Sequence, residues 1–320
     1  MPDIEEAVET KDLSELSEEE LAVIDQRVEE ILPSTIDDIR EFADSYDAPE
    51  QVEAVFKWDV TDIFYNYFFV GDAITLGGEA GWDTSDIHIY NEQAIANMKV
   101  YQELNQFFSV DTDEISYDGI IDDFVAGKLL FTVATSDAVA KLEQAKSDGL
   151  FTCDYGFTQT PDISETMPTR SLSMTQCVVV NGYSSYQEIA NDFAYFLTVD
   201  YADILYGRSG KVAAASKIEN ENDALDVFVA EYANSIPMPK MIETSNFWVE
   251  LEVAFAQIWD GADVNEQLKS LSEKIKTQIS GEDVIEEQIE EASEEETTIE
   301  YLDEEALREE AQQQNAASEE

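Results

Sequence analysis

SIPMPKMIETSNFWVELEVAFAQIWDGADVNEQLKSLSEKIKTQISG, residues 235–281, contains two amphipathic helix patterns joined by a short loop. Apolar residues recur every three or four positions in each pattern, as a single buried stripe on a helix requires. The first stripe is Phe247, Leu251, Phe255 and Ile258, and the second is Val264, Leu268, Leu271, Ile275 and Ile279. Gly261 and Gly281 follow the stripes, and a left-handed glycine commonly ends a helix. The segment predicts a helical hairpin packed on a larger body, with Trp248 one step off the first stripe.

The composition allows a sizeable core but excludes several classes of partner. The chain has 320 residues, 44% of them hydrophobic, which is enough for two domains or one large one. Its 17 Lys and Arg against 72 Asp and Glu give a formal charge of -55, which excludes nucleic acid and disfavours anionic membranes. Acids are dense at both ends, so we expect an acidic helical segment over 1–32 and an acidic, disordered tail over 282–320.

Strand and helix patterns alternate between these ends, which is typical of an α/β fold. A helix capped by Ser34 or Thr35 is followed by an aromatic strand that runs into a buried helix or turn over 52–70. Further helices are predicted from Asn91, from Ser116 to Gly127, from Ser136 to Gly149 and from Ser185, with Ser136 capping its helix. Strands are predicted over 129–134, 152–162 and 176–181.

The cysteines and the N-terminus bear on the cellular compartment. Cys153 and Cys177 could pair in an oxidising compartment or remain buried thiols, and we favour buried thiols. No stretch approaches 18 uninterrupted apolar residues, so no membrane span is expected. The start, MPDIEEAVET, has neither the basic end nor the apolar run of a signal peptide.

Several motifs together resemble bacterial extracellular solute-binding proteins of ABC importers, most nearly the maltose- and maltodextrin-binding branch. They are Ile-Pro-Met-Pro at 236–239, Ser-Asn-Phe-Trp at 245–248, Val-Asn-Glu-x-Leu-Lys at 264–269 and Val-Val-Val-Asn-Gly-Tyr-Ser at 178–184. The resemblance covers 33–281 and implies a periplasmic-binding-protein-like two-lobe fold that is N-terminally truncated. It implies a C-terminal lobe over 33–170, a returning part of the N-terminal lobe over 171–235, and a hairpin over 236–281 that completes the C-terminal lobe.

The resemblance also implies a function. The expected role is to bind a maltose- or malto-oligosaccharide-like sugar by lobe closure, outside the cell or at its surface, or in the periplasm of a Gram-negative cell. The implied partners are the sugar and the membrane subunits of an ABC permease. The missing units of the first lobe are consistent with a truncated frame, a fragment, or a protein whose other lobe is a separate chain. The alternative is an acidic interaction or remnant protein with no competent sugar cleft.

Six residues are candidate sugar contacts, because pyranose rings need flat apolar surfaces and hydroxyl partners at their edges. By resemblance, Trp248 would stack on the sugar with Met238 nearby. Asp62, Phe64 and Tyr65 resemble a cleft segment that carries a carboxylate and stacking rings. Trp58 and Asp59 lie close enough to compete for the same role. Asp137 stands where the family commonly has a Gly-Pro-Trp-like turn. The structural alternatives are an aromatic core for the rings and a helix N-terminal charge for Asp137.

Nothing in the sequence favours an enzyme. His88 is the single histidine and lies in an alternating stretch typical of an exposed strand residue. No nucleophile elbow, phosphate-binding loop or dinucleotide fingerprint occurs. Asp-rich stretches at 111–114 and 260–263 do not complete a calcium loop. We therefore expect no catalysis, no cofactor and no metal.

Overall fold

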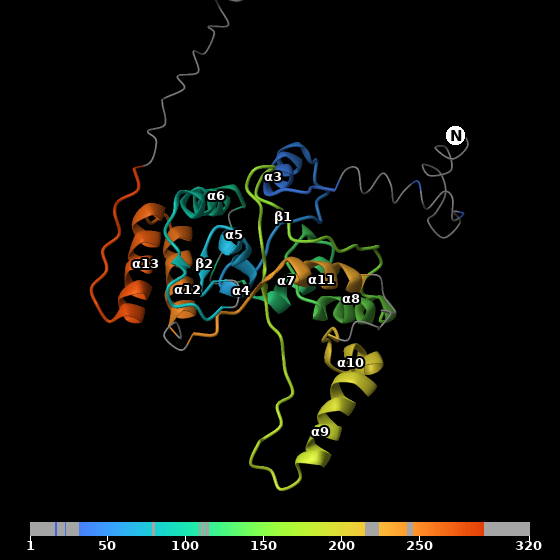
Figure 1. Ribbon diagram of the computed structural model, residues 1–320. Coiled ribbons are helices and arrows are strands. Elements are labelled where there is room, and N and C mark those ends of the chain that lie inside the picture. Colours follow the sequence, from blue (N-terminus) through green and yellow to red (C-terminus); the bar gives the residue numbers. More distant parts are fainter. Residues whose placement is uncertain are drawn as a thin grey trace, which may run out of the picture. The chain divides into compact units, whose positions relative to one another are not determined.

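A computed structural model describes residues 17, 23, 32–78, 81–108, 110, 112, 115–214, 224–241 and 246–290 (Figure 1). The chain divides into two compact units, Met1–Glu287 and Gln288–Glu320. The acidic helix expected within 1–32 and the tail beyond 290 lie outside the described residues. Among the described residues, no helix combines the length and the apolar character needed to cross a membrane.

The first unit mixes helices with short strands, so the α/β assignment is confirmed. Its helices are α3 (Ile36–Ser45), α4 (Ile63–Asn66), α5 (Phe68–Gly71), α6 (Glu92–Phe108), α7 (Tyr117–Val125), α8 (Asp137–Ser147), α9 (Gln187–Tyr195), the π-helical η2 (Phe196–Asp200), α10 (Ala202–Ser209), α11 (Ala224–Asn234), α12 (Phe247–Trp259) and α13 (Val264–Ser280). Its strands are β1 (Ala54–Phe56), β2 (Thr75–Leu76), β3 (Ile87–His88), β4 (Leu129–Phe131), β5 (Leu172–Ser173) and β6 (Ile236–Pro237). Within the described residues, β1 pairs parallel with β4, β5 parallel with β6, and β2 antiparallel with β3.

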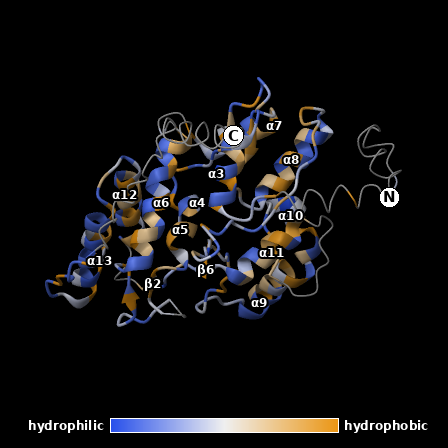
Figure 2. Ribbon diagram, turned by 90° about the horizontal axis from the view of Figure 1, so that it is seen from above, coloured by the Kyte–Doolittle hydropathy of each residue, from blue (hydrophilic) through white to orange (hydrophobic). Residues whose placement is uncertain are grey.

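The predicted helical hairpin is present as α12 and α13, and it packs against α6 (Figure 2). The first stripe is buried throughout, and the second is buried from Val264 to Ile275. Both glycines have left-handed backbones, with φ of 96° at Gly261 and 73° at Gly281. Aromatic rings join the layers, because the ring centroid of Tyr101 on α6 lies 5.0 Å from those of Phe255 and Trp259.

Helix caps largely follow the sequence. Thr35 and Asp38 form a reciprocal capping box at α3, and the Ser116 hydroxyl caps α7 by accepting from the Gly119 amide. The expected cap of α8 is wrong, because the Ser136 hydroxyl does not bond an amide of its own helix. It donates instead to the carbonyl of Gly210, at 3.1 Å, and so links α8 to the end of α10.

Two predicted strands and the predicted burial of the cysteines are wrong. Residues 152–162 and 176–181 contain no strand, because no described strand lies beside them; Asp162 alone forms an isolated bridge, to Thr35. Cys153 and Cys177 are free and exposed in these same extended stretches. A β-branched run favours an extended backbone, but burial needs a neighbouring element that covers it.

Gly71 at the end of α5 is required by close packing rather than by an unusual backbone angle. A Cβ on this residue would lie 1.8 Å from the carbonyl oxygen of Arg170. The Arg170 side chain in turn donates through Nε to the carbonyl of Asn234, at 2.8 Å. This contact therefore fixes α5 against the segments that lead into the paired strands β5 and β6.

Gly71→Ala should lower the free energy of unfolding by about 1 to 3 kcal/mol, the usual cost of overpacking a tight site. Gly207→Ala is the matched control, because it lies within α10 and a Cβ there would meet no atom within 4 Å. Urea unfolding followed by circular dichroism measures both variants. Equal stability of the two would show that Gly71 tolerates a side chain.

Candidate functional site

The segment before α4 is held by a buried hydrogen-bond network. The indole Nε1 of Trp58 donates to Asn66 Oδ1 at 2.8 Å, and both side chains are buried. Asn66 Nδ2 donates to the carbonyls of Val60 and Asp62, each at 2.9 Å. Since both polar atoms of the Asn66 side chain are bonded, α4 has a fixed position.

Three of the predicted site residues lie on or beside α4. Asp62 is exposed and caps the helix, because its Oδ1 accepts from the Phe64 amide at 2.9 Å. Phe64 and Tyr65 are half-buried and meet edge to face, with ring centroids 5.6 Å apart. Tyr65 also stacks on Tyr117 at 4.9 Å and an interplanar angle of 12°. Part of each ring thus stays open to solvent while another part is supported.

Tyr117 connects this group to Asp137. Its hydroxyl donates to Asp137 Oδ1 at 3.1 Å, and the Thr135 hydroxyl donates to the same oxygen. The Lys141 ammonium lies 3.0 Å from Asp137 Oδ2 and 4.6 Å from the centroid of the Tyr117 ring. The buried Asp59 holds the other end of Tyr117, because its Oδ2 accepts from the Tyr117 amide at 3.0 Å.

These contacts set the charges of the cluster. Burial opposes ionisation of Asp137, but hydrogen bonds from Thr135, Lys141 and Tyr117 and the charge of Lys141 outweigh it and lower its pKa below the ordinary value. Burial raises the pKa of Tyr65 and of Tyr117. At neutral pH the cluster therefore presents two protonated phenols beside an ionised carboxylate.

Trp248 and Met238 have other neighbours. Trp248 is half-buried in the first turn of α12, with its ring centroid 5.7 Å from Tyr67 and 5.2 Å from Phe247, both of which are buried. Met238 is half-buried in the segment after β6. The next residues of this segment bond the loop that carries Trp82, since the Lys240 amide donates to the Gly81 carbonyl at 2.6 Å.

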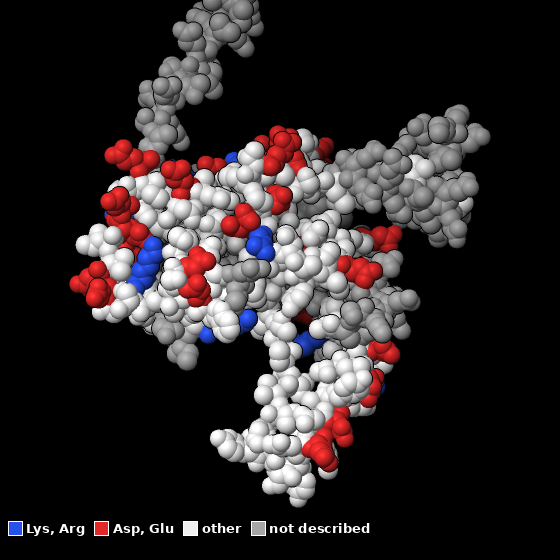
Figure 3. Space-filling view, viewed as in Figure 1, with Lys and Arg blue, Asp and Glu red and all other residues white. Residues whose placement is uncertain are grey.

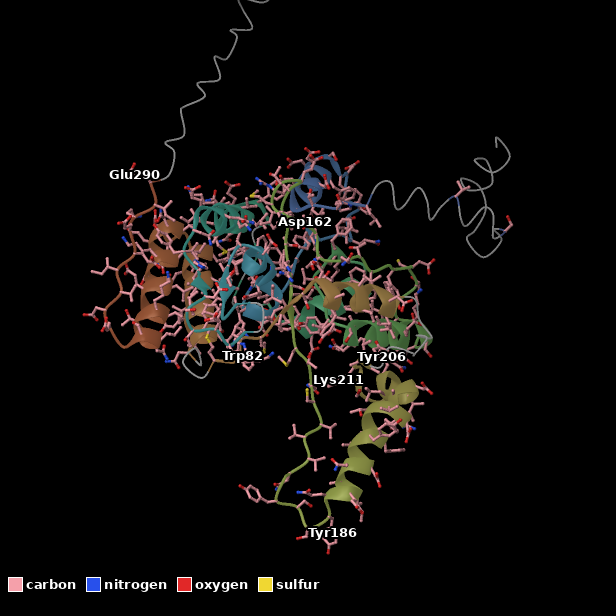
Figure 4. All side chains as sticks on the ribbon, viewed as in Figure 1. Trp82, Asp162, Tyr186, Tyr206, Lys211 and Glu290 are labelled. Carbon is pink, nitrogen blue, oxygen red and sulfur yellow. The ribbon has the colours of Figure 1, made fainter. Side chains whose placement is uncertain are left out.

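The structure therefore brings four of the six predicted residues together. Asp62, Phe64, Tyr65 and Asp137 are joined through Tyr65 and Tyr117. Trp248 packs on Tyr67, and Met238 lies in the segment that bonds the Trp82 loop. Sequence reasoning missed Tyr117, although its place directly after the Ser116 cap is a usable signal. It also missed Trp82, which is 73% exposed and is labelled in Figure 4.

A small pocket of about 140 Å³ lies between α4 and α12. Its lining includes Ile63, Asn66, Glu252, Phe255 and Trp259. None of the six predicted residues lines it, although Ile63 and Glu252 are close to them in sequence. The predicted contacts therefore lie outside this pocket.

Comparison with known proteins decides the fold. No protein-family model and no curated protein sequence matches the chain. Solved structures do match, among them an extracellular solute-binding protein from Staphylococcus aureus in complex with maltose, with a TM-score of 0.63, 17% identity, and coverage of 80% of this chain and 67% of that chain. The chain has a solute-binding-protein fold. The sequence-based expectation of this fold is confirmed.

Other solved relatives give the same result. The maltose-binding periplasmic protein of Listeria monocytogenes, in complex with maltose, has a TM-score of 0.63, 19% identity, and coverage of 80% of this chain and 69% of that chain. The MalX protein of Streptococcus pneumoniae, in complex with maltopentaose, has a TM-score of 0.62, 16% identity, and coverage of 80% and 69%. This solute-binding-protein fold is partial here, since the chain spans only about two thirds of the solved chains, 64 to 69% of their length.

Asp137→Asn should lower the free energy of unfolding at pH 7 by about 1 to 2 kcal/mol, because it weakens three hydrogen bonds and an ion pair that is partly exposed to solvent. Since the folded-state pKa of Asp137 is depressed, its contribution is present above the unfolded value and is lost as pH falls through the folded value. The difference between variant and wild type should therefore shrink in acid. Denaturant unfolding between pH 7 and pH 3 measures it.

Asp44→Asn, at an exposed position on α3, is the control. Its effect on stability should be small at each pH. If the two variants differed equally from wild type across the pH range, the cluster around Asp137 would not stabilise the ionised form.

Proposed function

We propose that this protein binds an oligosaccharide on the aromatic surface formed by α4 and the first turn of α12. The observation that carries the proposal is the partial burial and aromatic packing of three side chains. Phe64, Tyr65 and Trp248 are each half-buried, and each packs against another aromatic ring. Partly exposed rings in fixed positions suit the apolar faces of pyranose units. The fold is one whose solved relatives were crystallised with maltose and maltopentaose.

The candidate residues take different roles in this proposal. Trp248 and the Phe64–Tyr65 pair stack on the sugar, and Met238 adds an apolar contact. Asp62 caps α4 with one oxygen, and because a carboxylate has about four acceptor sites, it can still accept from a sugar hydroxyl. Asp137 is already bonded by Tyr117, Thr135 and Lys141, which favours a role in positioning Tyr117 over direct contact with the ligand.

The mechanism in this proposal is binding without catalysis. A malto-oligosaccharide-like sugar would be enclosed by closure of two lobes, a hinge motion that makes or breaks no covalent bond. By the resemblance of the sequence, the bound form would then dock on the membrane subunits of an ABC permease, outside the cytoplasm. The solved relatives support the ligand class by fold, and the half-buried rings support it by chemistry.

One observation favours the alternative of an interaction protein without a competent cleft. The chain spans only about two thirds of its solved relatives, so about a third of their length has no counterpart in it. A thermal-shift screen with maltose, maltotriose and maltopentaose separates the two functions. Stabilisation supports sugar binding, whereas a cooperative transition that no sugar moves supports the alternative.

Trp248→Ala should weaken binding of maltotriose at least about tenfold. Burying the apolar surface of a stacked tryptophan contributes roughly 1.5 to 3 kcal/mol to the binding free energy. Isothermal titration calorimetry on the 320-residue protein measures the change. Val253→Ala, at a 44% exposed position on the same helix, is the control and should leave the affinity unchanged. Unchanged affinity of the Trp248 variant would remove this residue from the site.

A further inference from the structure

Residues 174–209 carry a concentration of exposed apolar side chains. Eleven of the large hydrophobic residues that are exposed in the described chain lie here: Met174, Val178, Val179, Tyr183, Tyr186, Ile189, Phe193, Tyr195, Phe196, Val199 and Ile204. Their exposed fractions run from 44% at Phe196 to 99% at Tyr183. Figure 3 shows a largely uncharged surface over this segment, with acidic side chains along one edge. Contiguous apolar patches on a soluble protein usually mark an interaction site.

The backbone of this segment lacks partners as well. The run 176–181 is extended and β-branched, yet it pairs with no strand among the described residues. The helix that follows, α9, buries none of its residues. An extended stretch followed by a helix is one building unit of an α/β fold. Such a unit is stable when its extended stretch joins a sheet and its helix covers that sheet.

The base of the segment is firmly attached to the rest of the first unit. The Tyr206 hydroxyl on α10 donates to the Ser136 carbonyl at 2.7 Å and accepts from the Ala140 amide at 3.1 Å. Figure 4 shows Tyr206 at this base and Tyr186 at the far end of the segment. The exposed surface is therefore presented by an anchored element, so an occupant would bind a defined site.

Charge decides between the possible occupants. The segment carries Glu188, Asp192, Asp200 and Asp203 against a single Arg208, and the whole chain has a formal charge of -55. A second copy, or either acidic end of this chain, would bring like charges together. A partner that fits has an apolar sheet edge flanked by basic side chains. About a third of each solved relative has no counterpart here, and that length of polypeptide is enough for a module of this kind.

We propose that residues 174–209 are a docking surface for an α/β module that lies outside these 320 residues and has basic side chains around an open sheet edge. The module adds a strand beside 176–181, which gives the main-chain bonds, and packs its sheet under α9, which covers the apolar side chains. This docking requires no sugar, so its test is independent of the proposed function.

The first experiment identifies the occupant in the cells that produce the protein. A photoreactive benzoylphenylalanine replaces Val179 or Tyr186, and the same residue at Val249, an exposed position on α12, is the control. We expect both positions in the segment to cross-link to one polypeptide whose sequence alternates strands and helices, with the adduct mapped by mass spectrometry. Adducts only to a second copy, or no product beyond that from position 249, would overturn the proposal.

The second experiment measures docking with purified components. Cys177 lies within the extended run, and Cys153 is an exposed thiol outside it, so one protein contains both the probe and its control. Adding the purified polypeptide that the first experiment identifies should slow maleimide labelling of Cys177 at least about tenfold. The labelling rate of Cys153 should stay unchanged. Val179→Asp should abolish this protection, and Val249→Asp should not. Equal labelling of Cys177 with and without the polypeptide would contradict docking at this surface.

Discussion

The buried hydrogen bond from the Trp58 indole to Asn66 is the interaction on which the candidate site depends. The Trp58 ring lies 4.8 Å from the Phe56 ring on β1 and 5.7 Å from the Trp259 ring at the end of α12, measured between centroids. Through its ring contacts and this bond, the Trp58 side chain connects β1, the end of α12 and the short helix α4. Removing one partner would leave a buried polar atom unpaired, at a cost of roughly 1 to 3 kcal/mol. Because α4 has only one turn, this network and not helix propensity holds its rings in place.

Local pattern was sufficient to predict much of the fold. The stripes of α12 and α13, the glycines that end them and the caps at Thr35 and Ser116 depend on residues close together in sequence. The strand over 176–181 and the burial of Cys153 and Cys177 depend on neighbours that the described chain does not supply. Those expectations failed for this reason.

The candidate site shows the same limit. Sequence resemblance selected Phe64, Tyr65 and Trp248, and the structure places each as a half-buried ring, but it leaves their contact with a sugar as a proposal. Tyr117 was missed because its stacking on Tyr65 joins residues far apart in the chain. Trp58 and Asp59 lie beside the selected acid and look equally suitable in sequence. The structure buries both, so neither offers a surface to a ligand.

The acidic surface in Figure 3 affects how the fold responds to its solution. With 72 carboxylates against 17 cations, most acidic groups repel their neighbours and few have a cation to attract. Mobile cations screen this repulsion within about 10 Å at 0.1 M salt and within about 3 Å at 1 M. The folded state, which packs the charges more closely than the unfolded chain does, gains more from that screening. Dissolved salt thus acts as a stabilising component of this protein, and a concentrated electrolyte is the medium in which its charge is best tolerated.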